Sequence, residues 1–242
     1  MSGAVNHEPP FQVDGWLRRL AARLLAPRCL LCHEPGDGGE PLCAACAAGL
    51  PWNRSACLRC AVPLSAPGIC GACLQRPPPL GETRAAFVYA DPVDRLLPRL
   101  KFHHDLAAGR LLAAGMVRAF AGLPGLPEAL VPVPLHRGRL RRRGYDQALE
   151  LARPLARALA LPLLPGALRR IRATAPQSRL DAGARARNLR GAFTVDGDAR
   201  LPAHVALVDD VMTTGATLHD AARALRRAGV ARVDAWVCAR VP

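Results

Sequence analysis

The sequence predicts an α/β fold in which a mostly parallel sheet is flanked by helices, preceded by a small cysteine-rich module. Three observations predict it. Short apolar, β-branched runs alternate with longer Ala/Leu/Arg-rich stretches over the C-terminal two thirds of the chain, which is typical of βαβ units. Eight of the nine cysteines occur as four C-x2-C pairs in the N-terminal third. Near the C-terminus an apolar run leads through two aspartates and a hydroxyl-rich loop into a helical stretch.

The composition is that of a globular protein with a preference for anions. Half of the 242 residues are hydrophobic, so the chain can bury a core and is not expected to be disordered. The 33 basic and 19 acidic residues give a net charge of +14, which favours phosphates, diphosphates or nucleic acid as partners. Lys101 is the only lysine, so the excess is arginine and reflects either biased codon usage or selection for bidentate phosphate binding. No stretch approaches the ~18 apolar residues of a membrane span, and no leader pattern is found, so a cytoplasmic protein without membrane insertion is expected.

Three regions are expected along the chain. Residues 1–28 form an arm in which apolar side chains recur at helical spacing between Val13 and Leu24, with arginines between them. Such a basic amphipathic helix either packs on its own protein or touches a membrane or nucleic acid. Residues 29–76 hold the paired cysteines. The proline run at 77–79 cannot continue a helix or a central strand, so the α/β domain is placed at residues 80–242.

The elements of the α/β domain follow from its alternating pattern. A strand is expected at 85–89, helices at 92–101 and 106–120, a strand at 129–133 and a helix at 147–160. Residues 169–172 and 192–195 are expected to be short extended segments. The last unit has the clearest pattern, with a strand at 205–208, a helix at 217–228 and a strand at 232–238.

The cysteine pairs predict two structural zinc ions. The pairs are Cys29/Cys32, Cys43/Cys46, Cys57/Cys60 and Cys70/Cys73, separated by ten, ten and nine residues. Two thiolates at this spacing lie on one tight turn, and two such turns complete a tetrahedral four-thiolate site. Because all eight ligands are sulfur, no coordination position stays open, so the zinc is expected to be structural rather than catalytic.

The grouping of the pairs and their chemistry each have an alternative. Sequential grouping, with the first two pairs on one ion and the last two on the other, is favoured over an interleaved one by the turn-forming residues 37–39. A redox-active C-x-x-C motif is the alternative chemistry, although structural disulfides are not expected in a reducing compartment. Cys238 stands alone in an expected core strand, where a buried, inert thiol is the favoured interpretation.

Residues 205–217, with the sequence Val-Ala-Leu-Val-Asp-Asp-Val-Met-Thr-Thr-Gly-Ala-Thr, join the penultimate strand to its helix. Asp209 and Asp210 follow the strand, at the edge of an α/β sheet where ligands gather. Such carboxylates can accept hydrogen bonds from vicinal ribose hydroxyls and help hold a hydrated magnesium ion. The segment from Thr213 to Thr217 can wrap backbone N–H groups around a phosphate at the positive end of the helix, and Gly215 allows close approach. The alternative is an ordinary strand-to-helix turn with threonine capping.

This segment resembles the phosphoribosyl-diphosphate (PRPP) motif of type I phosphoribosyltransferases. Together with the cysteine module, it makes the chain resemble the ComF family of competence-associated phosphoribosyltransferase-like proteins over roughly residues 29–240. The resemblance implies a type I phosphoribosyltransferase fold behind a double zinc ribbon, with PRPP and Mg²⁺ bound beside Asp209 and Asp210. The residues it assigns to the ligand in this loop are Val211, Met212, Thr213, Thr214, Gly215, Ala216 and Thr217.

Two further stretches match the family pattern. Residues 130–137 read as a strand ending in a loop, which is followed by Arg139 and the arginine run at 141–143. This stretch resembles the family's diphosphate-binding loop, which assigns Pro134, Leu135, His136 and Arg137 to the ligand, and a solvated basic loop is the alternative. Residues 170–193 are too long for an idle connector and correspond to the family's flexible catalytic loop, with Arg172, Thr174, Gln177, Arg185 and Asn188 on its pattern. Arg172 and Arg185, closing over the site, would stabilise the leaving diphosphate and exclude water. Lys101 falls where family members carry a lysine, and a plain surface role is its alternative.

Two functions are consistent with these residues. The first is a transferase that moves the phosphoribosyl group from PRPP, or a related sugar phosphate, to an acceptor. The second is an accessory of the DNA-uptake machinery that binds single-stranded DNA and uses the PRPP site as a sensor. With 4% aromatic residues there is little surface on which bases could stack, so any contact with DNA is expected to be mainly between arginine and phosphate and to weaken with salt.

Overall fold

The computed structural model describes residues 27–37, 41–172, 191–197 and 199–242, which form parts of two compact units, Met1–Gly49 and Leu50–Pro242. The second cysteine group therefore belongs to the same unit as the sheet, and the first does not. The expected arm helix between Val13 and Leu24 lies outside the described residues. None of the helices in the described ranges is long and apolar enough to cross a membrane.

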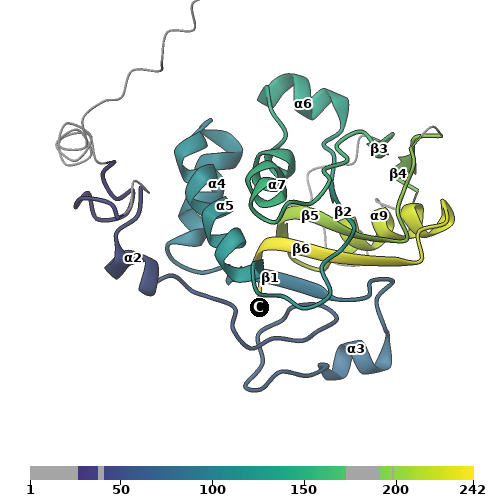
Figure 1. Ribbon diagram of the computed structural model, residues 1–242, viewed down its shortest axis with the longest axis horizontal. Coiled ribbons are helices and arrows are strands. Elements are labelled where there is room, and N and C mark those ends of the chain that lie inside the picture. The colour runs from purple at the N-terminus through teal and green to yellow at the C-terminus, as the bar shows by residue number, and fades with distance from the viewer. Residues whose placement is uncertain (1–26, 38–40, 173–190, 198) are drawn as a thin grey trace, which may run out of the picture. The chain divides into compact units, whose positions relative to one another are not determined.

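A four-stranded parallel sheet forms the centre of the second unit (Figure 1). Its strands are β1 (Thr83–Val88), β2 (Ala129–Pro132), β5 (His204–Met212) and β6 (Arg232–Arg240), in the order β1-β6-β5-β2. All three neighbouring pairs run parallel. Strands buried on both faces need apolar side chains throughout, which explains the apolar runs read from the sequence. The predicted α/β class with a parallel sheet is confirmed.

Helices cover both faces of this sheet. Three of them, α4 (Val93–Phe102), α5 (Leu106–Phe120) and α7 (Gln147–Ala158), gather on one face, with α5 against β1 and β6 and α7 against β2 and β5 (Figure 1). On the other side, α9 (Ala216–Arg227) packs on β5 and β6 and shares a core cluster with their buried side chains. Asp105 and Asp146 cap α5 and α7 by accepting hydrogen bonds from the first-turn amides.

Strand β5 is longer than the sequence predicts. The expected strand ended at residue 208, but β5 continues to Met212, because β6 also continues and pairs Asp209 with Val237 and Met212 with Arg240. Asp209 and Asp210 therefore lie inside the strand, near its C-terminal end, rather than in the loop that follows. A strand fixes the backbone at these two positions more firmly than a loop would.

A helix also begins where the sequence was read as a basic loop. Residues Arg137–Arg143 form α6, which begins after His136, whose Nδ1 accepts a hydrogen bond from the N–H of Gly138 (3.2 Å). It ends at Gly144 in the left-handed conformation, φ 80°. The loop between β2 and α6 is thus limited to residues 133–136, and Arg137 is helical.

A small antiparallel pair lies beside α9. It joins β3 (Leu168–Arg170) to β4 (Phe193–Val195). Buried Asp220 on α9 accepts hydrogen bonds from the N–H groups of Gly191 (3.1 Å) and Ala192 (2.9 Å). The expected catalytic loop runs between these two strands, and its residues 173–190, with Thr174, Gln177, Arg185 and Asn188, lie outside the described residues.

Candidate functional site

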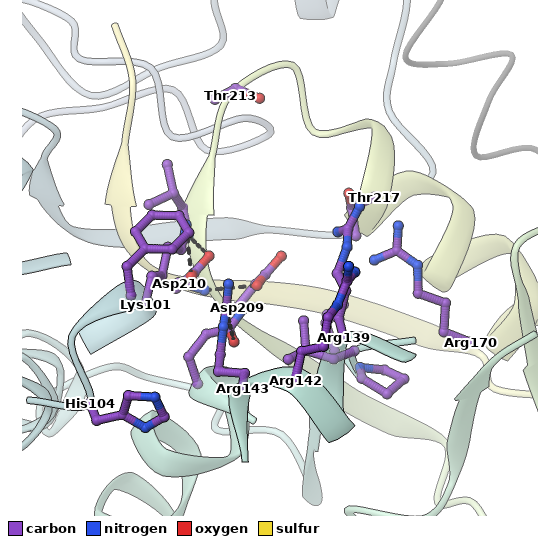
Figure 2. A pocket seen from close by; sticks show the side chains of 16 residues that line it. Lys101, His104, Arg139, Arg142, Arg143, Arg170, Asp209, Asp210, Thr213 and Thr217 are labelled. Carbon is purple, nitrogen blue, oxygen red and sulfur yellow. Dashed lines mark hydrogen bonds and ion pairs between the residues drawn. The ribbon is translucent and has the colours of Figure 1, made fainter. Parts of the chain in front are cut away.

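A cavity of about 590 Å³ lies where β2 and β5 end (Figure 2). This cavity is lined by side chains from several elements, namely the end of α4, the β2–α6 loop, α6, the start of α7, β3, the end of β5 and the loop after it. Its charged lining consists of five basic residues and two acidic ones, namely Lys101, Arg139, Arg142, Arg143, Arg170, Asp209 and Asp210. The excess of positive charge suits a ligand that carries several negative charges.

Asp209 and Asp210 are held in place by the backbone and by Lys101. The Asp210 N–H donates to Asp209 Oδ1 (2.8 Å), and the Val211 N–H donates to Asp210 Oδ1 (2.7 Å). Lys101 Nζ forms an ion pair with Asp210 Oδ2 at 2.8 Å, and the Asp210 side chain is only 6% exposed. Figure 2 shows both acids between Lys101 on one side and Arg139, Thr217 and Arg170 on the other.

The two acids differ in their electrostatic setting. Burial, followed by the negative charge of Asp210, raises the pKa of Asp209 well above the usual carboxyl range. Burial is the largest single influence on the Lys101 pKa and works to lower it, but the charge and hydrogen bond of Asp210 and the charge of Asp209 together outweigh it, so the Lys101 pKa is raised. Asp210 is thus already neutralised by a cation, whereas Asp209 gains most from one that arrives with a ligand.

The loop after β5 turns into α9 through a tightly packed glycine. Val211, Thr213 and Thr217 line the cavity, while Met212, Thr214, Gly215 and Ala216 are not among the lining residues. Gly215 caps α9 with φ 77°, and a Cβ there would lie 2.5 Å from Met212 Cε. Only glycine fits this conformation and this space. The 12-residue helix that follows directs the positive end of its dipole towards this loop.

The second wall of the cavity comes from the loop after β2. Pro134 and Leu135 line it, and the Leu135 N–H donates to Asp146 Oδ2 (2.8 Å), the same carboxylate that caps α7. His136 and Arg137 are not lining residues, and Arg137 is exposed. Three arginines of α6 line the cavity, and because they are three and four residues apart they share one face of the helix: Arg139, Arg142 and Arg143.

The third stretch contributes a different arginine from the one expected. Arg170, the last residue of β3, is 8% exposed and lines the cavity, with its guanidinium 5.4 Å from the centre of the Phe193 ring. Arg172 is exposed and is not among the lining residues, because β3 ends two residues before it. Arg185 lies outside the described residues.

The eight paired cysteines form two separate groups. Within each group, the sulfur atoms of Cys29, Cys32, Cys43 and Cys46, or of Cys57, Cys60, Cys70 and Cys73, all lie within 4.8 Å of one another. The Sγ atoms of Cys32 and Cys43 are 3.6 Å apart, and those of Cys60 and Cys70 are 3.7 Å apart. Tetrahedral zinc–thiolate bonds of about 2.3 Å place sulfurs about 3.8 Å apart, so both groups fit a zinc ion. The grouping is sequential.

The two groups are copies of one local structure. In each, the first cysteine donates its N–H to the carbonyl five residues on, at 2.7 Å for Cys29 to Glu34 and 2.9 Å for Cys57 to Val62. The residue after the second cysteine is left-handed, with φ 65° at His33 and φ 55° at Ala61. The third cysteine caps a short helix, α2 (Ala44–Ala48) or α3 (Gly71–Gln75). The repeated pairs in the sequence thus encode a repeated zinc knuckle.

Comparisons with known proteins agree with this architecture. A double zinc ribbon domain family matches residues 20–74. The chain is 37% identical over 223 residues to the DNA utilization protein YhgH of Escherichia coli K12, which covers 88% of this chain and 96% of the relative. It is 37% identical over 178 residues to competence protein F of Haemophilus influenzae, covering 71% and 78%, and 29% identical over 200 residues to competence protein ComFC of Bacillus subtilis, covering 79% and 80%. The chain belongs to the ComF family. In this ComF-family chain the segment that matches the double zinc ribbon contains both cysteine groups. The two groups are therefore structural zinc sites.

Some lining residues were not assigned from the sequence. Arg170 reaches the cavity without having been assigned to the site, and Arg139, Arg142 and Arg143 reach it from the stretch for which a solvated basic loop was the alternative. The i, i+3, i+4 spacing of the α6 arginines was the available signal, and it becomes visible only once 137–143 is taken as a helix. For Lys101, which had two interpretations, the structure places the side chain in the cavity of this ComF-family chain.

Proposed function

We propose that this chain binds PRPP together with Mg²⁺ in the cavity and acts as a phosphoribosyltransferase. The observation that carries the proposal is the alignment of Asp209 and Asp210 with the Gly215-capped start of α9, facing five basic side chains. A sugar with phosphate at one end and diphosphate at the other matches this arrangement of acids between two anion-binding regions.

The proposed binding mode assigns each part of the ligand to its own group of residues. The ribose hydroxyls donate to Asp209 and Asp210, and the 5-phosphate accepts from the amides of residues 213–217 and from the hydroxyl of Thr217. The diphosphate lies towards the residue 134–136 loop and the arginines of α6, with Arg170 beside it. Asp209 and Asp210 would help to hold Mg²⁺ together with the diphosphate. The ion would neutralise negative charge on the diphosphate as it leaves.

The proposed reaction breaks the bond between the anomeric carbon and the diphosphate oxygen. The electron pair leaves with diphosphate while positive charge develops on the sugar, and a nucleophile of the acceptor then bonds to the same carbon. Arg139, Arg142 and Arg143, which line the cavity, would stabilise the growing negative charge. Arg172 and Arg185 are proposed to join them when the intervening segment covers the ligand and excludes water.

A link to DNA uptake is proposed from the relatives. Proteins named for competence and DNA utilization are similar to this chain over most of its length, and its net charge is +14. We propose that the chain serves the DNA-uptake machinery in the cytoplasm. In the alternative function, it binds single-stranded DNA without turnover, and PRPP acts as a signal at the same cavity.

Titration calorimetry with PRPP and Mg²⁺, and in parallel with single-stranded DNA, tests the proposal. The wild type should bind PRPP at one site, and Asp209→Asn/Asp210→Asn should weaken binding by about a hundredfold, because two hydrogen-bonding carboxylates are lost. Asp196→Asn, which removes an acid paired with Arg169 away from the cavity, is the matched control. Loss of PRPP binding with unchanged DNA binding would separate the two roles. A wild type that binds no PRPP would contradict the proposal.

A further inference from the structure

Arg240 connects a zinc-ligand residue to the strand that carries the proposed phosphate loop. Its Nε donates to the carbonyl oxygen of Cys60 at 2.8 Å, and its Nη1 donates to the carbonyl oxygen of Met212 at 3.2 Å. The same Nη1 also contacts the carbonyl of Val241. A single guanidinium thus holds backbone oxygens of the second ribbon and of the end of β5 at once.

On the ribbon side, Arg240 contacts a turn whose backbone is anchored in the core of the protein. Ala61, directly after Cys60, is fully buried in the core cluster of the sheet and α9, and its carbonyl accepts from Asn53 Nδ2 at 2.9 Å. Arg59 Nη1 donates to the carbonyls of Leu80 (3.1 Å) and Gly81 (3.0 Å), before β1. A metal ion bound by the second cysteine group would therefore help to fix the carbonyl that Arg240 binds.

On the other side, Arg240 meets the last residue before the loop. Met212 ends β5, and its carbonyl also accepts the N–H of Val241 at 3.0 Å. The Met212 Cε would lie 2.5 Å from a Cβ on Gly215, so the Met212 side chain packs directly against the loop. A shift at Met212 would move Thr213, the next residue, which lines the cavity.

We propose that Arg240 is a positioning residue through which the second zinc site, but not the first, sets the conformation of the residue 213–217 loop. Arg240 does not line the cavity, so it acts on ligand affinity through Met212 rather than by contact. The expected effect of Arg240 on ligand affinity rests on the proposed PRPP function. Its expected effect on the conformation of the residue 213–217 loop does not.

The test compares four full-length variants by zinc content, PRPP calorimetry and hydrogen exchange of residues 213–217. Arg240→Ala should keep both zinc ions, raise exchange in the loop and weaken PRPP binding about tenfold, since a hydrogen bond from a charged group is lost. Arg240→Lys should give an intermediate affinity, because an ammonium keeps the charge but not the planar fork. Arg232→Ala, at the opposite end of β6 and paired with Asp234, is the matched control and should leave the loop unchanged. Cys32→Ser/Cys43→Ser should lose one zinc and keep wild-type exchange in the loop.

The outcomes separate this inference from the proposed function. Unchanged loop exchange in Arg240→Ala, or an equal effect of Arg232→Ala, would overturn the positioning role. Raised loop exchange in Cys32→Ser/Cys43→Ser would overturn the selectivity for the second site. If the wild type binds no PRPP, the proposed function fails, while loop exchange in Arg240→Ala still decides the role of Arg240.

Discussion

Lys101 at the end of α4 forms an ion pair with Asp210 near the end of β5, with 2.8 Å between Nζ and Oδ2. The pair joins two elements that are far apart in the sequence and closes one side of the cavity. Burial and the negative charge of Asp210 raise the pKa of Asp209. Asp209 is therefore the carboxyl that gains more from a cation or from hydroxyl donors. Asp210 is thus paired with a cation of the protein before any ligand arrives, whereas Asp209 gains more from the ligand itself.

Replacing Lys101 with methionine should destabilise the protein. The change leaves a largely buried Asp210 without its cation, so we expect a loss of about 1–3 kcal/mol in the free energy of unfolding. Urea denaturation measures this loss. Lys101→Met/Asp210→Asn should recover part of it, because the remaining buried side chain is neutral. If the double variant is no more stable than Lys101→Met, the ion pair does not account for the loss.

Replacing Gly215 with alanine should abolish ligand binding at the loop. The new methyl group meets Met212 and His219 in a left-handed backbone, so both the loop and its support must shift. Gly125→Ala is the matched control, since Gly125 also has a positive φ, 67°, with open space around it. We expect both variants to lose about 1 kcal/mol to backbone strain, and Gly215→Ala to lose more. Equal stability and equal PRPP affinity in the two variants would contradict the close-packing argument.

The arginines of α6 should divide by the face on which they lie. Arg139 has its pKa lowered by burial and by Arg143 and Arg142, so an anion relieves repulsion among the three. Arg139→Ala should therefore weaken PRPP or diphosphate binding by about tenfold or more, and the effect should shrink as salt is added. Arg137→Ala, from the exposed first residue of the same helix, should change affinity little. Calorimetry at two salt concentrations compares them, and equal losses would refute the assignment.

Affinity for PRPP with Mg²⁺ should rise with pH while Asp209 titrates. The raised pKa means that the free folded protein keeps the Asp209 proton above the ordinary carboxyl range, and binding a cation requires its release. Stability without ligand should change in the opposite direction. The unfolded chain releases this proton at lower pH, so the Asp209 contribution to stability falls as pH rises from the ordinary pKa to the raised one. Asp209→Asn should remove both slopes. A pH dependence that survives in Asp209→Asn would assign it to another group.

Much of this architecture could be predicted because its sequence signals are local. The C-x2-C spacing fixes the zinc knuckles, and the alternation of apolar and helical stretches fixes the parallel sheet. Helix α6 was missed because Arg137–Arg143 contains one apolar residue, Leu140, so no hydrophobic periodicity marks it. The extension of β5 was missed because adjacent aspartates usually disfavour a strand, and here pairing with β6 outweighs that local preference.

The parts of the site that escaped prediction depend on tertiary structure. Arg170 was passed over for Arg172 because only the end of β3 decides which arginine turns into the cavity. The contact between Arg240 and Cys60 joins residues separated by 180 positions, and no local pattern encodes it. Such contacts become visible only when the sheet order brings the C-terminal strand beside the second ribbon.

A structure of this chain with PRPP and Mg²⁺ tests the central claim most directly. The account predicts the 5-phosphate on the amides of residues 213–217, the ribose hydroxyls on Asp209 and Asp210, and the diphosphate facing Arg139 and the residue 134–136 loop. A ligand bound elsewhere on the chain, or bound in the cavity with its ribose away from both aspartates, would contradict it.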